Sequence, residues 1–214
     1  MTGFPGSLLD GYRSFRESRY EPERGRYRAL AEHGQTPEVM VIACCDSRSA
    51  PETVFNAAPG EIFVVRNVAN LVPPYEPDGR HQSTSAALEF AVQSLKVRHV
   101  VVLGHGRCGG IRAALHPEAE PLSPGDFIGK WMTLLGPAAR ETAAGAGSAM
   151  TEAERQTALE RVSVRNSVAN LRTFPCVSIL EDRGRLHLHG AWFDIADGEL
   201  WTMDQATGDF SRAE

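Results

Sequence analysis

The sequence lacks any long hydrophobic run. A membrane-spanning helix needs about 20 mostly apolar residues, and no such stretch occurs in the 214 residues, so we expect no membrane partner. Residues 1–15 also lack a basic segment followed by an apolar one, the pattern of a secretory signal. Cysteine is scarce, and the four present are too few for a disulfide framework. These absences predict a cytoplasmic protein whose cysteines are metal ligands, catalytic groups or core side chains.

The sequence also lacks an excess of positive charge. It has 22 lysines and arginines against 27 acidic residues, a net charge of −5. Because nucleic-acid binding depends on basic side chains that neutralise phosphates, this balance argues against a nucleic-acid partner. Arginines are frequent near the amino terminus, but glutamates interleave them. We therefore expect a helical surface there that faces solvent or another subunit.

The length and the hydrophobic pattern predict one α/β domain over residues 1–214, with a helical arm at about 7–33 that is interrupted near Pro22. Short apolar runs alternate with helical patterns, which is typical of a mainly parallel central β-sheet flanked by helices. The predicted buried strands are Val39–Ala43, Ile62–Arg66, His99–Leu103 and Val177–Leu180, and helices are predicted at 83–95, from residue 109 to 115 and at about 162–171. Residues 186–203 are predicted to form two edge strands that turn at Asp197–Gly198.

Three potential metal ligands follow two of these predicted strands. Cys44 comes directly after the first strand, and His105 and Cys108 follow the third. Ligands collect at the carboxyl ends of strands in α/β sheets, so the three side chains should meet there. Two thiolates and an imidazole suit Zn²⁺, and three protein ligands leave a fourth position open, as in catalytic zinc sites. Taken singly, Cys44 could be a buried core thiol and His105 a histidine that caps a turn.

The other two cysteines have no chemistry assigned to them. Cys45 is adjacent to Cys44, so its side chain should point elsewhere, and we expect it in the core or around the ligands. Cys176 lies beside Pro175 at the start of a predicted strand and is expected to fill the core.

The spacing Cys44-x-Asp46-x-Arg48, followed by His105-x-x-Cys108, resembles the signature of the β-class carbonic anhydrases. The resemblance covers roughly residues 28–210 and implies that a zinc-bound hydroxide hydrates carbon dioxide reversibly to bicarbonate and a proton. It implies one zinc per chain, held by Cys44, His105 and Cys108. It also implies a homodimer or higher even oligomer, in which the amino-terminal helices reach over the partner and each active site is lined by two subunits. Further matching segments are Pro59-Gly60-Glu61, Val65 to Asn70, Val72 to Tyr75 and Gly104 to Ile111.

The resemblance makes Asp46 and Arg48 a catalytic dyad beside the open zinc position, and a physical reason supports this role. Two thiolates cancel the charge of Zn²⁺, so such a zinc should acidify water less than one held by three neutral histidines, where the pKa of bound water is about 7. Asp46 could accept a hydrogen bond from the bound hydroxide and orient it. Arg48 could keep Asp46 ionised through a bidentate pair. The alternative is an ordinary structural salt bridge.

Five further positions resemble the substrate pocket of the plant-type enzymes. They are Gln35, Phe63, Val68, Phe90 and Gly109. Phe90 stands where those enzymes have a tyrosine, so a hydroxyl contact would be missing. Without the resemblance, Phe63, Val68 and Phe90 would be interpreted as core side chains, and Gln35 as a surface residue. Val41 stands where the bicarbonate-regulated members have a tryptophan, so we expect a site that is open at neutral pH.

Two other functions remain compatible with the sequence. The same scaffold and zinc ligands could serve a hydrolase of carbon disulfide or carbonyl sulfide, which differs in access to the pocket. A non-catalytic zinc-binding protein is the second alternative. Loss of Asp46 or Arg48 would signal it, and both residues are present.

Overall fold

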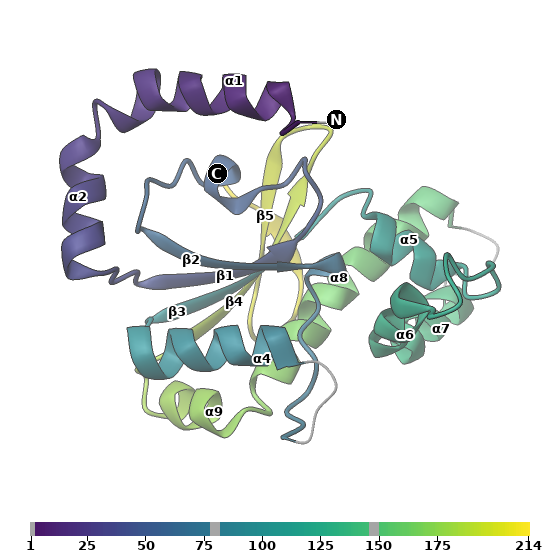
Figure 1. The fold of residues 1–214 in the computed structure, drawn as a ribbon. Coiled ribbons are helices and arrows are strands. Elements are labelled where there is room, and N and C mark those ends of the chain that lie inside the picture. The colour runs from purple at the N-terminus through teal and green to yellow at the C-terminus, as the bar shows by residue number, and fades with distance from the viewer. Residues whose placement is uncertain (1–2, 78–81, 146–149) are drawn as a thin grey trace.

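A six-stranded mixed sheet forms the centre of the computed structural model, which describes residues 3–77, 82–145 and 150–214. The strand order is β2-β1-β3-β4-β5-β6 (Figure 1). The first four strands in this order are parallel, and β5 is antiparallel to both of its neighbours, which confirms the prediction of a mainly parallel sheet. The strands are β1 (Val39–Cys44), β2 (Ile62–Asn67), β3 (His99–His105), β4 (His187–Asp194), β5 (Glu199–Met203) and β6 (Phe210–Arg212).

Two strand predictions near the carboxyl terminus are wrong. The segment Val177–Leu180 lies in helix α9 (Pro175–Asp182), where Pro175 occupies the first turn and Val177 is buried. An apolar run of four residues fits a buried helix turn as well as a strand, and proline favours the first turn of a helix. The strand at residues 187–194 is not an edge strand, because β4 pairs with β3 on one side and β5 on the other. The turn at Gly198 is confirmed, with φ of +70°.

One face of the sheet is covered by helices α4 (Gln82–Glu89), α8 (Glu152–Leu171) and α9 (Figure 1). Their side chains Leu88, Val164 and Val177 pack with Ile42 and Val102 of the strands in the main core. A π-helical turn, Phe90–Leu95, continues α4. Helix α8 begins at Thr151, which forms a capping box with Glu154. This reciprocal cap satisfies backbone N–H groups that have no partner within the helix and fixes where α8 starts.

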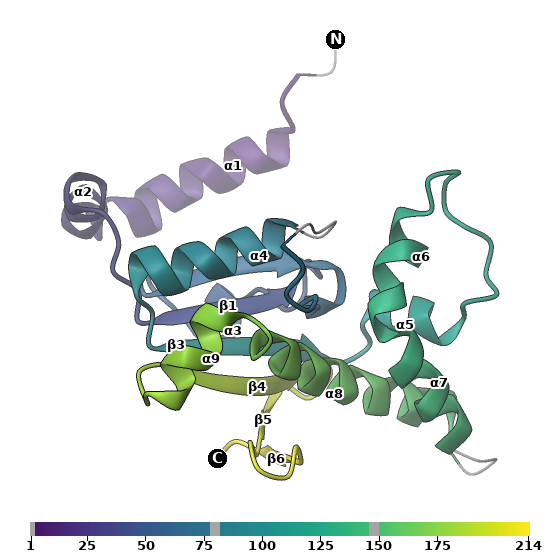
Figure 2. The ribbon, with the colours of Figure 1, turned by 90° about the horizontal axis from the view of Figure 1, so that it is seen from below.

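The amino-terminal arm stands apart from the sheet (Figures 1 and 2). It comprises α1 (Gly6–Phe15), a π-helical turn (Arg16–Tyr20) and α2 (Arg24–His33), and the segment between the last two contains Pro22. None of the described residues in these three elements is buried. Apolar side chains of the arm are exposed, including Phe4, Leu8 and Tyr12.

A helical lobe lies beyond the carboxyl end of the parallel strands (Figure 2). It contains α5 (Gly109–Leu115), α6 (Phe127–Met132), a 3-10 turn (Thr133–Leu135) and α7 (Gly136–Gly145). Ile111, Leu135 and Leu159 form its buried core together with Cys44 and Cys108. The lobe therefore packs directly against the ends of the strands. Two short elements complete the fold, α3 (Pro51–Val54) and the 3-10 turn Val68–Asn70. Among the described helices, none is long and apolar enough to span a membrane.

Candidate metal centre

The parallel pairing of β1 with β3 brings the three predicted ligands together. Cys44 ends β1, His105 ends β3, and Cys108 precedes the first turn of α5. All three are buried, and their donor atoms lie within 4.8 Å of one another. The Cys44 Sγ to Cys108 Sγ distance is 3.9 Å. Two thiolates bound tetrahedrally to zinc at about 2.3 Å are separated by about 3.8 Å, so the sulfur spacing fits this ion.

The imidazole of His105 is oriented for metal binding. Its Nδ1 lies 2.9 Å from the carbonyl oxygen of Gly106, so Nδ1–H donates and Nε2 carries the lone pair. Within the described residues, this buried Nε2 has no hydrogen-bond partner. A buried polar atom without a partner is costly, and a cation held with Cys44 and Cys108 would satisfy it. The donor set therefore fits zinc.

The electrostatics of the two thiols also call for a cation. A hydrogen bond from Cys108 lowers the pKa of Cys44 to about 4, assisted by His105 and by the Ala69 N–H, 3.3 Å from Cys44 Sγ. The pKa of Cys108 is raised, first by its bond to Cys44 and then by burial. Burial lowers the pKa of His105, but Cys44 outweighs this and raises it overall. Two thiolates so close together can both ionise only when a positive charge lies between them.

Asp46 and Arg48 form a bidentate pair at the edge of this centre. Arg48 Nε donates to Asp46 Oδ1 at 2.9 Å, and Arg48 Nη2 donates to Oδ2 at 2.7 Å. The Arg48 guanidinium holds the pKa of Asp46 well below its usual range, so Asp46 is an ionised acceptor. Its Oδ2 lies 3.9 Å from His105 Nε2, on the metal-binding side of the imidazole. The carboxylate therefore borders the cluster of ligand atoms.

A second arginine holds the end of β1. Arg66 on β2 donates from Nε to the Cys44 carbonyl at 2.8 Å and from Nη2 to the Asp46 carbonyl at 2.6 Å. These bonds fix the short segment that carries a ligand and the dyad carboxylate. The β2–β1 pairing, which aligns Cys44 with Asn67, places Arg66 within reach.

The sequence interpretation missed a buried carboxylate behind the metal centre. Glu160 of α8 is 1% exposed, and its Oε1 accepts the Cys108 backbone N–H at 2.9 Å. Gln156 Nε2 also donates to Oε1, at 3.1 Å, and Trp192 Nε1 donates to Oε2, at 3.1 Å. Burial raises the pKa of Glu160, and these three donors oppose the rise. Three donors around one carboxyl group indicate its ionised form, because a protonated group would need an acceptor.

The surroundings of Glu160 explain how such a carboxylate is held. The guanidinium of Arg161 stacks between the rings of Trp192 and Trp201, 4.7 and 4.6 Å from their centroids. Burial lowers the pKa of Arg161, and the nearby Glu160 carboxylate opposes this shift. Arg161 therefore contributes positive charge near Glu160. A signal in the sequence pointed to Glu160: it lies on the same helical stripe as the buried Val164 and Val168.

The five predicted pocket residues fall into two groups within one chain. Gln35 and Phe90 line one hollow, and the Phe63 ring lies 5.8 Å from the Phe90 ring. Val68 and Gly109 line another hollow, beside α5 and α6. Phe90 is 48% exposed and Val68 39%, so the interpretation of these two as core residues is wrong. Phe63 is half-buried and packs against the main core.

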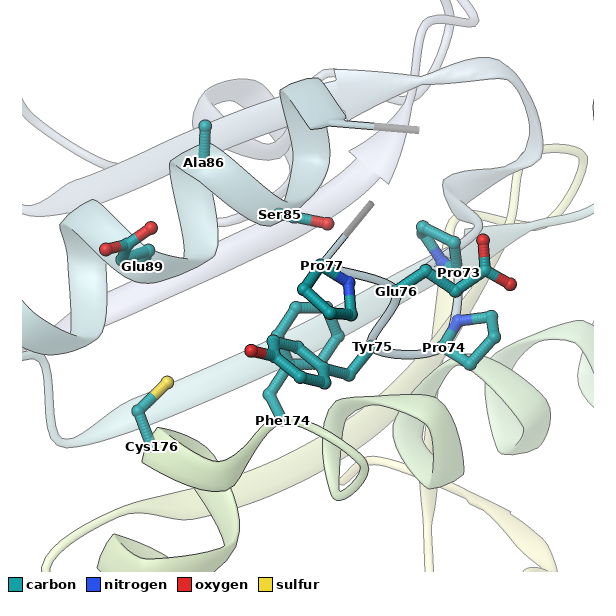
Figure 3. A pocket seen from close by; sticks show the side chains of 10 residues that line it. All are labelled: Pro73, Pro74, Tyr75, Glu76, Pro77, Ser85, Ala86, Glu89, Phe174 and Cys176. Carbon is teal, nitrogen blue, oxygen red and sulfur yellow. The ribbon is translucent and has the colours of Figure 1, made fainter. Parts of the chain in front are cut away.

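Of the two remaining cysteines, Cys176 agrees in part with expectation, because it packs against the main core, and Cys45 does not. Cys45 is exposed, so the interpretation of it as a core residue is wrong. The alternation of side chains along β1 turns it away from Cys44. Cys176 is half-buried in the first turn of α9 and lines a pocket with Tyr75 and Phe174 (Figure 3). None of the described residues lining that pocket belongs to the metal centre.

The fold and the donor set define an α/β protein with a Cys₂His metal centre at the carboxyl ends of its parallel strands. Residues 39–200 match a sequence profile of the family described as carbonic anhydrase, and the chain belongs to the β class of this enzyme family. It is 37% identical over 203 residues to beta carbonic anhydrase 5, chloroplastic, of Arabidopsis thaliana, an alignment that covers 94% of this chain and 66% of the relative.

Solved structures agree with this assignment. The β-carbonic anhydrase CcaA superposes with a TM-score of 0.90 at 27% identity, with 97% of this chain and 91% of that chain covered. One of two tetrameric β-carbonic anhydrases of Sordaria macrospora superposes with a TM-score of 0.80 at 29% identity, with 96% and 97% covered. The cytoplasmic location stays a prediction, since the Arabidopsis relative is named as chloroplastic.

Proposed function

We propose that this protein catalyses the reversible hydration of carbon dioxide to bicarbonate and a proton, with one zinc ion per chain. The observation that carries the proposal is the Cys44, His105 and Cys108 cluster with the Asp46–Arg48 pair at its edge. Zinc in such a site supplies a Lewis acid that lowers the pKa of water. Family membership supports the same reaction.

Asp46 has the position and charge to orient the attacking water. Arg48 keeps it ionised, so the carboxylate can accept a hydrogen bond but cannot donate one. Arg48 is itself anchored by a bond from Nη2 to the Arg107 carbonyl, at 3.2 Å. The pair is therefore fixed on both sides, and Asp46 Oδ2 remains next to His105 Nε2. Because both Asp46 oxygens are engaged by Arg48, we propose that Asp46 stays off the metal at neutral pH.

Two subunits are proposed to complete each active site. Val68 and Gly109 lie next to the turn that carries Cys108, whereas Gln35, Phe63 and Phe90 cluster at a separate hollow. We propose that the second group lines the site of a partner. The exposed apolar side chains of the arm and the tetrameric Sordaria relative support a homo-oligomer of even order with the arm over the partner.

Stopped-flow measurement of carbon dioxide hydration tests the function. Wild-type protein loaded with zinc should be active, and Arg48→Ala should keep its zinc but lose activity by about 10–100-fold. Arg98→Ala is the matched control and should remain active, because this exposed arginine lies at the opposite end of β3 from His105. Absence of activity in the zinc-loaded wild type would refute the proposal. The same protein assayed with carbonyl sulfide and carbon disulfide would then decide between the hydrolase alternative and a non-catalytic zinc protein.

A further inference from the structure

Three histidines gather at the amino-terminal ends of β3 and β4. His99 begins β3, and His187 and His189 are the first and third residues of β4. The parallel register places His99 opposite His187. Side chains alternate along a strand, so His187 and His189 lie on the same face, away from the helices that cover Val100 and Leu188. None of the three has a role in the proposed reaction.

The imidazole of His99 contacts those of His187 and His189. His99 Nδ1 lies 3.1 Å from His189 Nε2, and the His99 ring centroid is 5.3 Å from those of both His187 and His189. Two ligand nitrogens at 2.0–2.1 Å from one tetrahedral ion are separated by about 3.3 Å. The His99–His189 pair therefore already has nearly the spacing of two ligands on one metal ion. A single shared hydrogen atom now occupies the place between these nitrogens.

We propose that His99, His187 and His189 form a second metal site, for a divalent transition-metal ion such as Zn²⁺, Ni²⁺ or Cu²⁺. His99 and His189 supply the preset pair of nitrogens. His187 supplies the third, after its ring turns from its present stacking on His99. This rotation is available because His187 is exposed. Imidazole ligands suit these ions.

The protonation states favour binding. Burial, followed by the neighbouring imidazoles of His99 and His187, lowers the pKa of His189. A neutral imidazole is the form that binds metal. When the ion enters, the hydrogen atom between His99 and His189 moves to the other nitrogen of the ring that carried it. Both lone pairs then face the ion.

This site is separate from the catalytic centre. His105 lies six positions after His99 along β3, which corresponds to about 20 Å at 3.3 Å per residue. The two centres lie at opposite ends of the same strand. A metal ion bound by His99, His187 and His189 would tie β3 to β4 and stabilise the folded protein, since a ligand that binds only the native state raises its stability.

Nickel binding to the zinc-loaded protein tests the proposal. Equilibrium dialysis against Ni²⁺, followed by metal analysis of nickel and zinc together, should give about one nickel per chain with the catalytic zinc retained. His187→Ala and His99→Ala should each lose this nickel. His33→Ala removes an exposed histidine of α2 and is the matched control, which should bind nickel as the wild type does. Nickel should raise the melting temperature of wild type and control only.

Two results would overturn the proposal. The first is that the wild type binds no nickel beyond that bound by His99→Ala in the same dialysis. The second is that His187→Ala and His99→Ala bind as much nickel as the wild type. His187 is exposed, so its alanine variant should fold. The test is therefore decisive even if variants of the half-buried His189 fail to fold. Neither readout depends on carbonic anhydrase activity.

Discussion

Replacement of the buried carboxylate behind Cys108 tests how the metal centre is held. We expect Glu160→Gln to fold but to bind zinc more weakly. Glu160 accepts the N–H of Cys108 at 2.9 Å, and Gln156, which also donates to Glu160, bonds the Cys108 carbonyl at 3.1 Å. Both backbone polar groups of this ligand are therefore engaged from α8. The carboxylate also places a negative charge near the cation site.

The magnitude follows from the hydrogen bonds. Glutamine has one side-chain oxygen, so it can accept from Cys108 and Gln156 or from Trp192, but not from both sides. One buried N–H then faces the amide NH₂. A hydrogen bond to a charged group contributes about 1.5–3 kcal/mol, and an unsatisfied buried donor costs about 1–3 kcal/mol. Burial of the Glu160 charge is unfavourable and raises its pKa. The neutral glutamine avoids this cost, which offsets part of the lost hydrogen-bond energy. We expect the zinc affinity to fall by about 10–100-fold.

Competition with a coloured zinc chelator measures this affinity directly. Glu152→Gln is the matched control, because it removes an exposed carboxylate from the first turn of the same helix. Trp192→Phe removes one of the three donors to Glu160 and should weaken zinc binding less. Cobalt-substituted protein provides a second readout, since the thiolate-to-cobalt absorption band should shift in Glu160→Gln and stay unchanged in Glu152→Gln. Zinc affinity equal to that of the wild type, with an unchanged cobalt band, would refute the positioning role of Glu160.

Three further predictions concern the centre and the assembly. Cys108→Ser should purify with almost no zinc, because a serine hydroxyl is not a normal zinc ligand; full occupancy on metal analysis would contradict the ligand set. The folded pKa of Asp46 lies below its unfolded value of about 3.9, so the Asp46–Arg48 pair stabilises the fold above that pH and loses this effect as the pH falls through the folded pKa. Acid unfolding of Arg48→Ala should therefore begin at higher pH than that of wild type, and coincident curves would contradict the assignment. Deletion of residues 1–33 should reduce the assembly size and the activity, and an unchanged sedimentation coefficient would contradict the role of the arm.

The cluster of Cys44, His105 and Cys108 could be predicted from the sequence without knowledge of the order of the strands in the sheet. Cys44 and His105 follow short apolar runs, and the carboxyl ends of parallel strands share one edge of a sheet. Cys108 lies within one turn of His105 in the chain, so it could not be far away. Asp46 and Arg48 lie two and four residues after Cys44, so their nearness to the ligands could also be expected, whereas their role as a dyad was implied by the family resemblance.

Other features depend on contacts between distant segments and could not be predicted in this way. Glu160 meets Cys108 across 52 residues, and Trp192 meets Glu160 across 32. The error at Val177–Leu180 has a different origin, because a short apolar run carries no period that separates a strand from a helix turn. Only the preceding Pro175 favoured the helix that the structure shows.

We propose that one set of residues positions a metal ligand and that another set orients the attacking water. Glu160, with its donors from α8 and Trp192, lies on the buried side of Cys108 and controls the ligand. Asp46 and Arg48 lie on the more exposed side, where Arg48 is 49% exposed, and are proposed to orient the water. Two thiolates already balance the charge of Zn²⁺, so Glu160 strengthens cation binding while it disfavours further loss of a proton from water. The Asp46–Arg48 pair would compensate for this, because the ionised Asp46 can accept a hydrogen bond from the water. Substitution of Glu160 should therefore act mainly on zinc affinity, and substitution of Arg48 mainly on the hydration rate.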